Sequence, residues 1–175
     1  EDGSEIETDA VILSMGYTPN SELASQWGIP VNSNGFIKVD EYMRTPVKNI
    51  LAVGDCAEKH DFVTRKVTNM MLASTACAEG RIAGMNLFKL NAIKTFSGTI
   101  SIYSTSINGS AFGTAGLTEA AAKAEGFEVV SGYFEGVDRH PGKLPGSHKQ
   151  AVKLIVARES GVVIGGEAFG GPSVG

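Results

Sequence analysis

The sequence is poor in charge. Only 19% of its 175 residues are Asp, Glu, Lys or Arg, below the ~25% of an average globular protein. Fifteen basic and nineteen acidic residues give a net charge of -4, and no run of like charge could follow a phosphate backbone or an anionic bilayer. We therefore expect neither nucleic acid nor a membrane as a partner.

Long apolar runs and cysteines are also scarce. Apolar runs such as residues 10–13 and 50–53 stop after four residues, against the ~20 that cross a bilayer. Cys56 and Cys77 are too few and too widely spaced for a disulfide framework or a zinc knuckle, and the three histidines show no metal-ligand spacing. We expect no metal site and a cytoplasmic location.

Glycine and apolar residues are abundant. The 22 glycines exceed the ~7% background, which indicates tight turns and close backbone approaches. An apolar content of 42% suits one domain of ordinary size or two small ones. The chain begins at Glu1 rather than Met and stops in the turn-rich residues 170–175, so we expect a fragment of a larger protein.

The first half alternates short apolar runs with turns. Residues 9–14 predict a strand buried on both faces, and residues 28–40 predict a small hairpin around residues 32–35. Residues 49–54 predict a second apolar strand. Asp55 follows directly, at the strand end where ligands of open α/β sheets bind.

A long helix is predicted over residues 69–90, which contain no proline. One face carries Met71, Thr75, Ala78, Ile82 and Met85 at helical spacing. A second stripe carries the small residues Ala73, Ala76, Gly80 and Gly84. Such a stripe lets a backbone or a flat ligand approach closely.

From about Thr95 the pattern is that of an α+β domain. Residues 99–107 alternate with a period of two, as in a strand with one outward face. Thr118 is placed to cap a helix over residues 119–125 that Gly126 ends. Residues 127–133 predict a strand, and residues 151–157 and 162–169 predict a hairpin.

The segment from Thr45 to Asp55 carries a specific spacing, in which six residues separate Thr45 from Ala52 and Gly54 directly precedes Asp55. It resembles the second flavin-binding motif of the pyridine nucleotide-disulfide oxidoreductases, in which the aspartate holds a ribityl hydroxyl of FAD. An ionised acceptor suits that bond. The alternative is that Asp55 only caps the following turn.

Neighbouring segments resemble the same family in the same order. Residues 8–20 resemble its return from the NAD domain to the FAD domain, and residues 35–40 resemble the hairpin before the flavin motif. Residues 72–86 resemble the helix whose start presents backbone amides to the flavin ring. The cofactor-binding residues that the resemblance implies are Gly54, Asp55, Met71, Leu72 and Ala73.

Gly98, Thr99 and residues 113–119 resemble the branch of NADH oxidases, NADH peroxidases and coenzyme A-disulfide reductases. The implied fold class is α/β: the carboxyl-terminal part of a FAD-binding Rossmann-like domain followed by an α+β dimerisation domain. Residues 1–15 would end the NAD domain, residues 16–94 belong to the FAD domain, and residues 95–175 form a truncated interface domain.

The resemblance implies a homodimeric flavoprotein that oxidises NAD(P)H and passes electrons through FAD and an upstream cysteine to a small-molecule acceptor. Oxygen, peroxide, coenzyme A disulfide and sulfur stay open as acceptors, as does NADH against NADPH. Because the redox cysteine and the dinucleotide loops lie upstream in the family, no catalytic residue is assigned here, and Cys56 and Cys77 are interpreted as core. Lys143 lies in a loop that could approach a partner's active site, or could simply be solvated. The rival interpretation is a non-catalytic dimerisation module without bound flavin.

Overall fold

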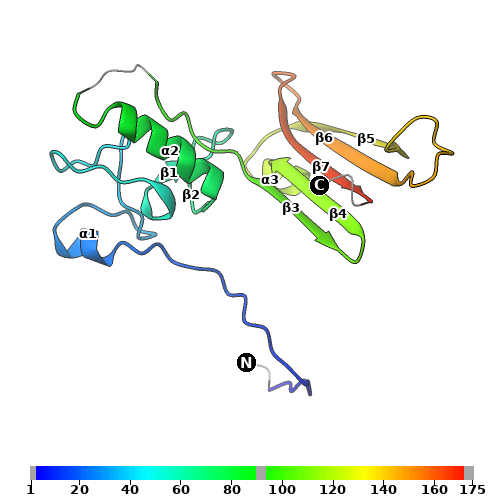
Figure 1. Cartoon of the computed structure of the whole chain (residues 1–175), viewed down its shortest axis with the longest axis horizontal. Coiled ribbons are helices and arrows are strands. Elements are labelled where there is room, and N and C mark those ends of the chain that lie inside the picture. Colours follow the sequence, from blue (N-terminus) through cyan, green and yellow to red (C-terminus); the bar gives the residue numbers. More distant parts are fainter. Residues whose placement is uncertain (1–2, 90–93, 172–175) are drawn as a thin grey trace.

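The computed structural model describes residues 3–89 and 94–171. Its elements form two groups joined by residues 94–101 (Figure 1). Residues 1–2, 90–93 and 172–175, which include the last residue of the predicted long helix, lie outside the described residues. The first group contains α1 (Glu22–Gln26), the 3-10 helix η1 (Gly54–Cys56), β1 (Lys59–His60), β2 (Val67–Thr68) and α2 (Ala73–Met85).

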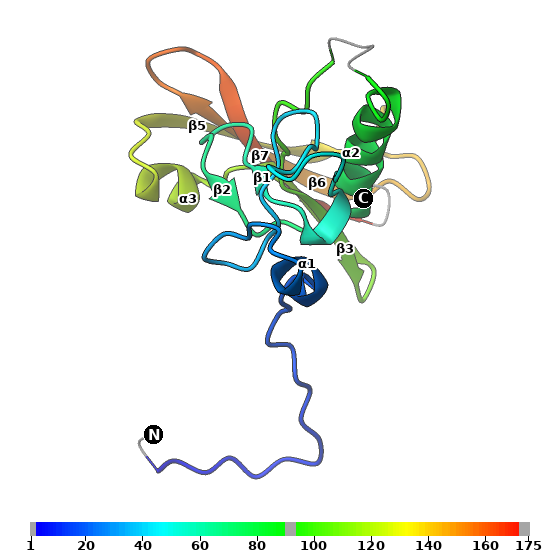
Figure 2. The same cartoon turned by 90° about the vertical axis from the view of Figure 1, so that its left-hand side faces the viewer.

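The two apolar strands predicted in the first group do not form. Residues 9–14 are extended and exposed, and they lead away from the other elements (Figures 1 and 2). A buried strand needs neighbours for its N–H and C=O groups, and within residues 3–89 and 94–171 no strand pairs with this segment. Among the described residues, those at 49–54 pair only through an isolated bridge between Leu51 and Arg44.

The hairpin predicted over residues 28–40 is confirmed. Val31 pairs with Ile37 in an antiparallel bridge, and the Asn32 N–H donates to the Phe36 carbonyl at 2.8 Å. Ile37 then reaches the 3-10 turn, since its N–H donates to the Cys56 carbonyl at 2.8 Å. The hairpin therefore supports the segment that carries Asp55.

Helix α2 is shorter than predicted and buries a different set of side chains. It begins at Ala73, four residues after Asn69, and its buried residues are Thr75, Glu79, Ile82 and Ala83. Thr75 and Ile82 were expected on this face, whereas Met85 is 41% exposed. The buried side of α2 therefore includes the carboxylate of Glu79, which was not expected there, and excludes Met85, which was.

The second group is a five-stranded antiparallel sheet with the order β3-β4-β7-β6-β5. Thr118 caps α3 as predicted, since its Oγ1 accepts from the Ala121 N–H at 3.2 Å, and the predicted hairpin is the pair β6 and β7. The elements are β3 (Ile102–Ile107), β4 (Ser110–Gly116), α3 (Glu119–Ala124), β5 (Val129–Val137), β6 (Lys149–Ala157) and β7 (Val163–Gly170).

Helix α3 covers only one end of one face of this sheet. Its Ala122 packs with the buried residues Ile155, Ala157 and Ile164. Farther along the same face, large apolar side chains are exposed, and the Phe112 and Phe169 rings lie 4.9 Å apart. The exposed large apolar residues of the sheet include Tyr103, Phe112, Tyr133, Phe134, Leu154 and Phe169.

The junction between the two groups is tied by backbone and side-chain bonds. The Thr99 N–H donates to the His60 carbonyl at 2.9 Å, and the Phe62 N–H donates to the Thr99 carbonyl at 2.8 Å. Gly98 has a φ of +109°, and a Cβ there would lie 2.8 Å from the His60 carbonyl oxygen. Only glycine fits this position without a shift of the chain.

Candidate flavin-binding site

The predicted site residues Gly54 and Asp55 form a tight turn after an extended segment. Val53 is extended, with a φ of -142°, and Gly54 has a φ of +82°, which favours glycine. The turn closes when the Ala57 N–H donates to the Gly54 carbonyl at 3.0 Å. Asp55 is exposed on this turn, so its carboxylate is accessible to a ligand.

The turn packs against the first turns of α2. A Cβ on Gly54 would lie 3.6 Å from the Ala76 Cβ, which is ordinary contact. Helix α2 starts after Leu72, whose backbone is extended, and no side chain in the described part of the protein caps it. The first N–H groups of any α-helix have no intrahelical acceptor, and those of α2 also lack a side-chain acceptor at the cap position. Met71 and Leu72 are half-buried and Ala73 is exposed.

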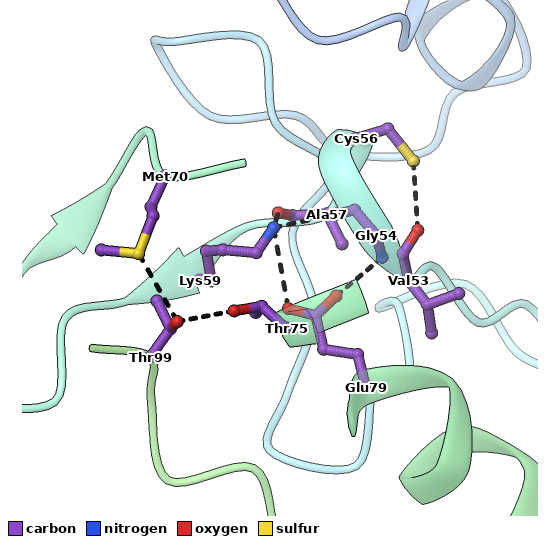
Figure 3. A network of polar contacts seen from close by, with 9 residues as sticks. All are labelled: Val53, Gly54, Cys56, Ala57, Lys59, Met70, Thr75, Glu79 and Thr99. Atoms are coloured by element: carbon purple, nitrogen blue, oxygen red, sulfur yellow. Dashed lines mark hydrogen bonds and ion pairs between the residues drawn. The ribbon is translucent and has the colours of Figure 1, made fainter. Parts of the chain in front are cut away.

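A buried ion pair lies beneath the turn, between Lys59 of β1 and Glu79 of α2 (Figure 3). The Lys59 side chain is 1% exposed and the Glu79 side chain is fully buried, with Nζ and Oε1 3.6 Å apart. The Lys59 ammonium also donates to the carbonyls of Gly54 and Ala57, at 2.9 Å each. Glu79 Oε2 accepts from the Gly54 N–H at 2.7 Å.

Glu79 sits in an environment that disfavours its charge. Burial raises the pKa of the Glu79 carboxyl, and the nearby Asp55 charge adds to that rise. The Gly54 N–H and the Lys59 ammonium act in the opposite direction. Sequence reasoning missed this pair, although the position of Glu79 between Thr75 and Ile82 on the predicted buried face was a usable signal.

A second polar link joins the start of α2 to the segment that leads into the sheet (Figure 3). The Thr75 and Thr99 hydroxyl oxygens lie 2.7 Å apart. Thr99 Oγ1 also donates to the Met70 sulfur at 3.5 Å. The residues that precede and open α2 are thus bonded to the segment that connects the two groups.

The other chemically reactive residues are dispersed. Cys56 packs against the apolar cluster near Ala57, as expected, whereas Cys77 is exposed, contrary to the prediction that it is core. The reason is that Cys77 faces away from the buried side of α2, which carries Thr75 and Glu79. Among residues 3–89 and 94–171, no group of three or more His, Cys, Asp or Glu could hold a metal ion.

The loop with Lys143 is held at its base. The Asp138 carboxylate accepts from the His148 N–H at 3.0 Å, and its other oxygen lies 3.3 Å from His148 Nδ1. His148 is therefore bonded to the protein, while His60 and His140 are exposed. Lys143 is exposed in the same loop.

None of the helices in the described part of the chain has the length and apolar content needed to span a membrane.

Comparison with known proteins identifies the class to which this fold and turn belong. Residues 1–80 match the family described as "Pyridine nucleotide-disulphide oxidoreductase". Residues 104–175 match the dimerisation domain of the same family. The chain belongs to the pyridine nucleotide-disulphide oxidoreductase family, and its expected fold class, part of a Rossmann-like FAD-binding domain followed by an α+β dimerisation domain, is confirmed.

Relatives with known names place the chain in the expected branch. It is 32% identical to the "NAD(P)H sulfur oxidoreductase (CoA-dependent)" of Pyrococcus furiosus over 97% of this chain and 38% of that protein. The "NAD-Dependent Persulfide Reductase from A. fulgidus" is 33% identical with a TM-score of 0.81, over 89% of this chain and 28% of that one. The "Water-forming NADH oxidase from Lactobacillus brevis" is 30% identical with a TM-score of 0.84, over 97% of this chain and 37% of that one. The chain thus spans between 28% and 38% of the length of these three relatives.

Proposed function

We propose that this chain supplies part of the flavin site and the subunit contact of a flavoprotein that oxidises NAD(P)H. The observation that carries the proposal is the Gly54–Asp55 turn packed against the uncapped start of α2. The family match supports it, because the matched family includes enzymes named for NADH oxidation and for sulfur reduction. The division into residues 1–15, 16–94 and 95–175 remains part of this proposal.

The residues present have the chemistry that FAD requires. Asp55 offers an exposed carboxylate, a suitable acceptor for a ribityl hydroxyl. The backbone N–H groups at the start of α2, after Met71 and Leu72, are donors at the positive end of a helix dipole. Ala73 has no side chain beyond Cβ to obstruct that end. When bound, FAD supplies hydride acceptance from NAD(P)H and electron delivery to the final acceptor.

The acceptor is proposed at the level of class: oxygen, peroxide or a sulfur compound such as a persulfide or disulfide. The test uses the gene product, expressed with any coding sequence that flanks residues 1–175. We expect a yellow protein that oxidises NADH or NADPH, and separate assays with each acceptor would assign the substrate. A colourless product that neither binds added FAD nor oxidises NAD(P)H would refute the proposal.

Self-association is the second part of the proposed function. The match to a dimerisation domain suggests it, and the exposed rings of Phe112 and Phe169 provide apolar surface that association would bury. Sedimentation of residues 1–175 should show a dimer. Paired serine substitutions of Phe112 and Phe169, or of Phe134 and Leu154 on the opposite face, would identify the face used. A clean monomer at all accessible concentrations would contradict this part.

The rival function is an association module that binds no flavin. It predicts a dimer that stays colourless when FAD is added. The exposed carboxylate of Asp55 would then have no ligand, and Asp55→Ala would change nothing measurable. Flavin titration of the purified gene product separates the two interpretations directly.

A further inference from the structure

The backbone of Gly54 is held at both of its polar groups by one buried ion pair. The Gly54 N–H donates to Glu79 Oε2 at 2.7 Å, and the Gly54 carbonyl accepts from Lys59 Nζ at 2.9 Å. Lys59 also bonds the Ala57 carbonyl at the far end of the turn. Asp55 and Cys56 are thus the two residues spanned by a support made from β1 and α2.

Both charged side chains of this support are enclosed by the fold. The Lys59 ammonium lies 6.0 Å from the centre of the buried Phe36 ring, and β1 pairs Lys59 with Thr68. Glu79 is fully buried within α2. Both side chains therefore stay beneath the turn.

Stability alone is a weak reason for such a pair. The desolvation of two buried charges is costly, and well-packed apolar residues often replace a buried ion pair with no loss of stability. The Glu79 Oε1 atom accepts no hydrogen bond among the described residues, apart from its ion pair with Lys59. An apolar pair at these positions would not bond the N–H and the carbonyl of Gly54, as Glu79 and Lys59 do.

We propose that Lys59 and Glu79 are positioning residues for Asp55: by bonding both backbone groups of Gly54, they fix the direction in which the next residue presents its carboxylate to the flavin. This inference rests on the proposed function, since it requires FAD as the ligand of Asp55. It assigns the pair no contact with the flavin itself.

The decisive variant is the double substitution Lys59→Met with Glu79→Met, which removes both charges and keeps the volume buried. We expect a lower melting temperature than that of the wild type, because the Gly54 N–H and the Ala57 carbonyl lose their partners. We also expect a dissociation constant for FAD raised about tenfold, which corresponds to the loss of roughly one hydrogen bond. The gene product is stripped of flavin, and FAD binding is measured by fluorescence titration well below the melting temperature. The matched control is Lys66→Met with Glu125→Met, an exposed lysine–glutamate pair away from the turn, which should leave FAD affinity unchanged.

A cycle with Asp55→Ala tests whether the pair acts through Asp55. If it does, Asp55→Ala costs less affinity in the double variant than in the wild type. Additive losses, or an unchanged FAD dissociation constant whatever the melting temperature, would overturn the inference. If the double variant fails to fold, Lys59→Met with Glu79→Gln replaces it in the same cycle, because the glutamine amide oxygen can still accept from the Gly54 N–H while the Gly54 carbonyl loses its lysine donor. A wild type that binds no FAD, or an Asp55→Ala variant with full affinity, would instead refute the proposed function.

Discussion

Replacement of Asp55 by alanine should weaken FAD binding with almost no effect on folding. Asp55 is exposed, and within residues 3–89 and 94–171 its carboxylate has no hydrogen-bond or ion-pair partner, so the melting temperature should barely change. A hydrogen bond to a charged group contributes ~1.5–3 kcal/mol. At ~1.4 kcal/mol per decade, this loss raises the FAD dissociation constant about 10- to 100-fold.

The assay is fluorescence titration of the flavin-free gene product with FAD. Asp55→Asn keeps an acceptor without the charge, so its loss should be about half as large in free energy. Glu41→Ala removes an exposed carboxylate outside the turn and serves as the matched control. The reasoning would be refuted if Asp55→Ala retained full flavin while Cys56→Ser abolished activity, because the reactive group would then lie at this turn.

Three further outcomes are expected. Hydrogen bonds, above all from Lys123, lower the pKa of Glu119 from 4.5 to about 2. The stability that Glu119 adds over a Glu119→Gln variant should therefore be complete above pH 4.5 and vanish as the pH falls to about 2. A difference in urea midpoint that stays constant with pH would contradict this expectation. Gly98→Ala should cost ~1–3 kcal/mol because of its positive φ and the nearby His60 carbonyl, whereas Gly84→Ala, whose Cβ meets open space, should stabilise α2 by up to ~1 kcal/mol. A melting temperature that does not fall in Gly98→Ala would contradict the first expectation, and one that falls in Gly84→Ala would contradict the second. Cys56→Ser should leave turnover nearly intact in a steady-state NAD(P)H assay, since Cys56 packs against an apolar cluster. A loss of activity would mean that Cys56 takes part in the reaction.

The sequence predicted best where structure is determined locally. Thr118 and Gly126 bound α3 as their types require, and the turn at residues 32–35 forms where Asn and Gly cluster. In the sheet, the alternation over residues 99–107 identified β3, although the strand begins at Ile102 and is exposed on both faces rather than on one. Capping and turn preferences depend on a few adjacent residues, so they can be read without the fold.

Predictions failed where an element depends on distant partners. The apolar run at residues 9–14 has strand composition, but a buried strand exists only beside other strands. Cys77 was assigned to the core by composition, yet the orientation of α2 exposes it. For the candidate site, motif spacing selected Gly54 and Asp55, whereas their support from β1 was invisible in the spacing.

The Lys59–Glu79 pair shows why that support was missed. A glutamate between an alanine and a glycine on a predicted helix is usually solvated. Lys59 follows the motif by only four residues, so each charge by itself suggests a surface position. Burial becomes acceptable only when the two side chains meet and share the polar groups of Gly54. The burial of each charge therefore depends on the other, and their contact depends on how β1 packs beside α2.

The predicted buried face of α2 gave one indication from the sequence, because Glu79 follows Thr75 by four residues and precedes Ile82 by three. A charge at core spacing on a helix that packs against a Gly–Asp turn is thus a reason to look for a buried partner before assigning that charge to solvent.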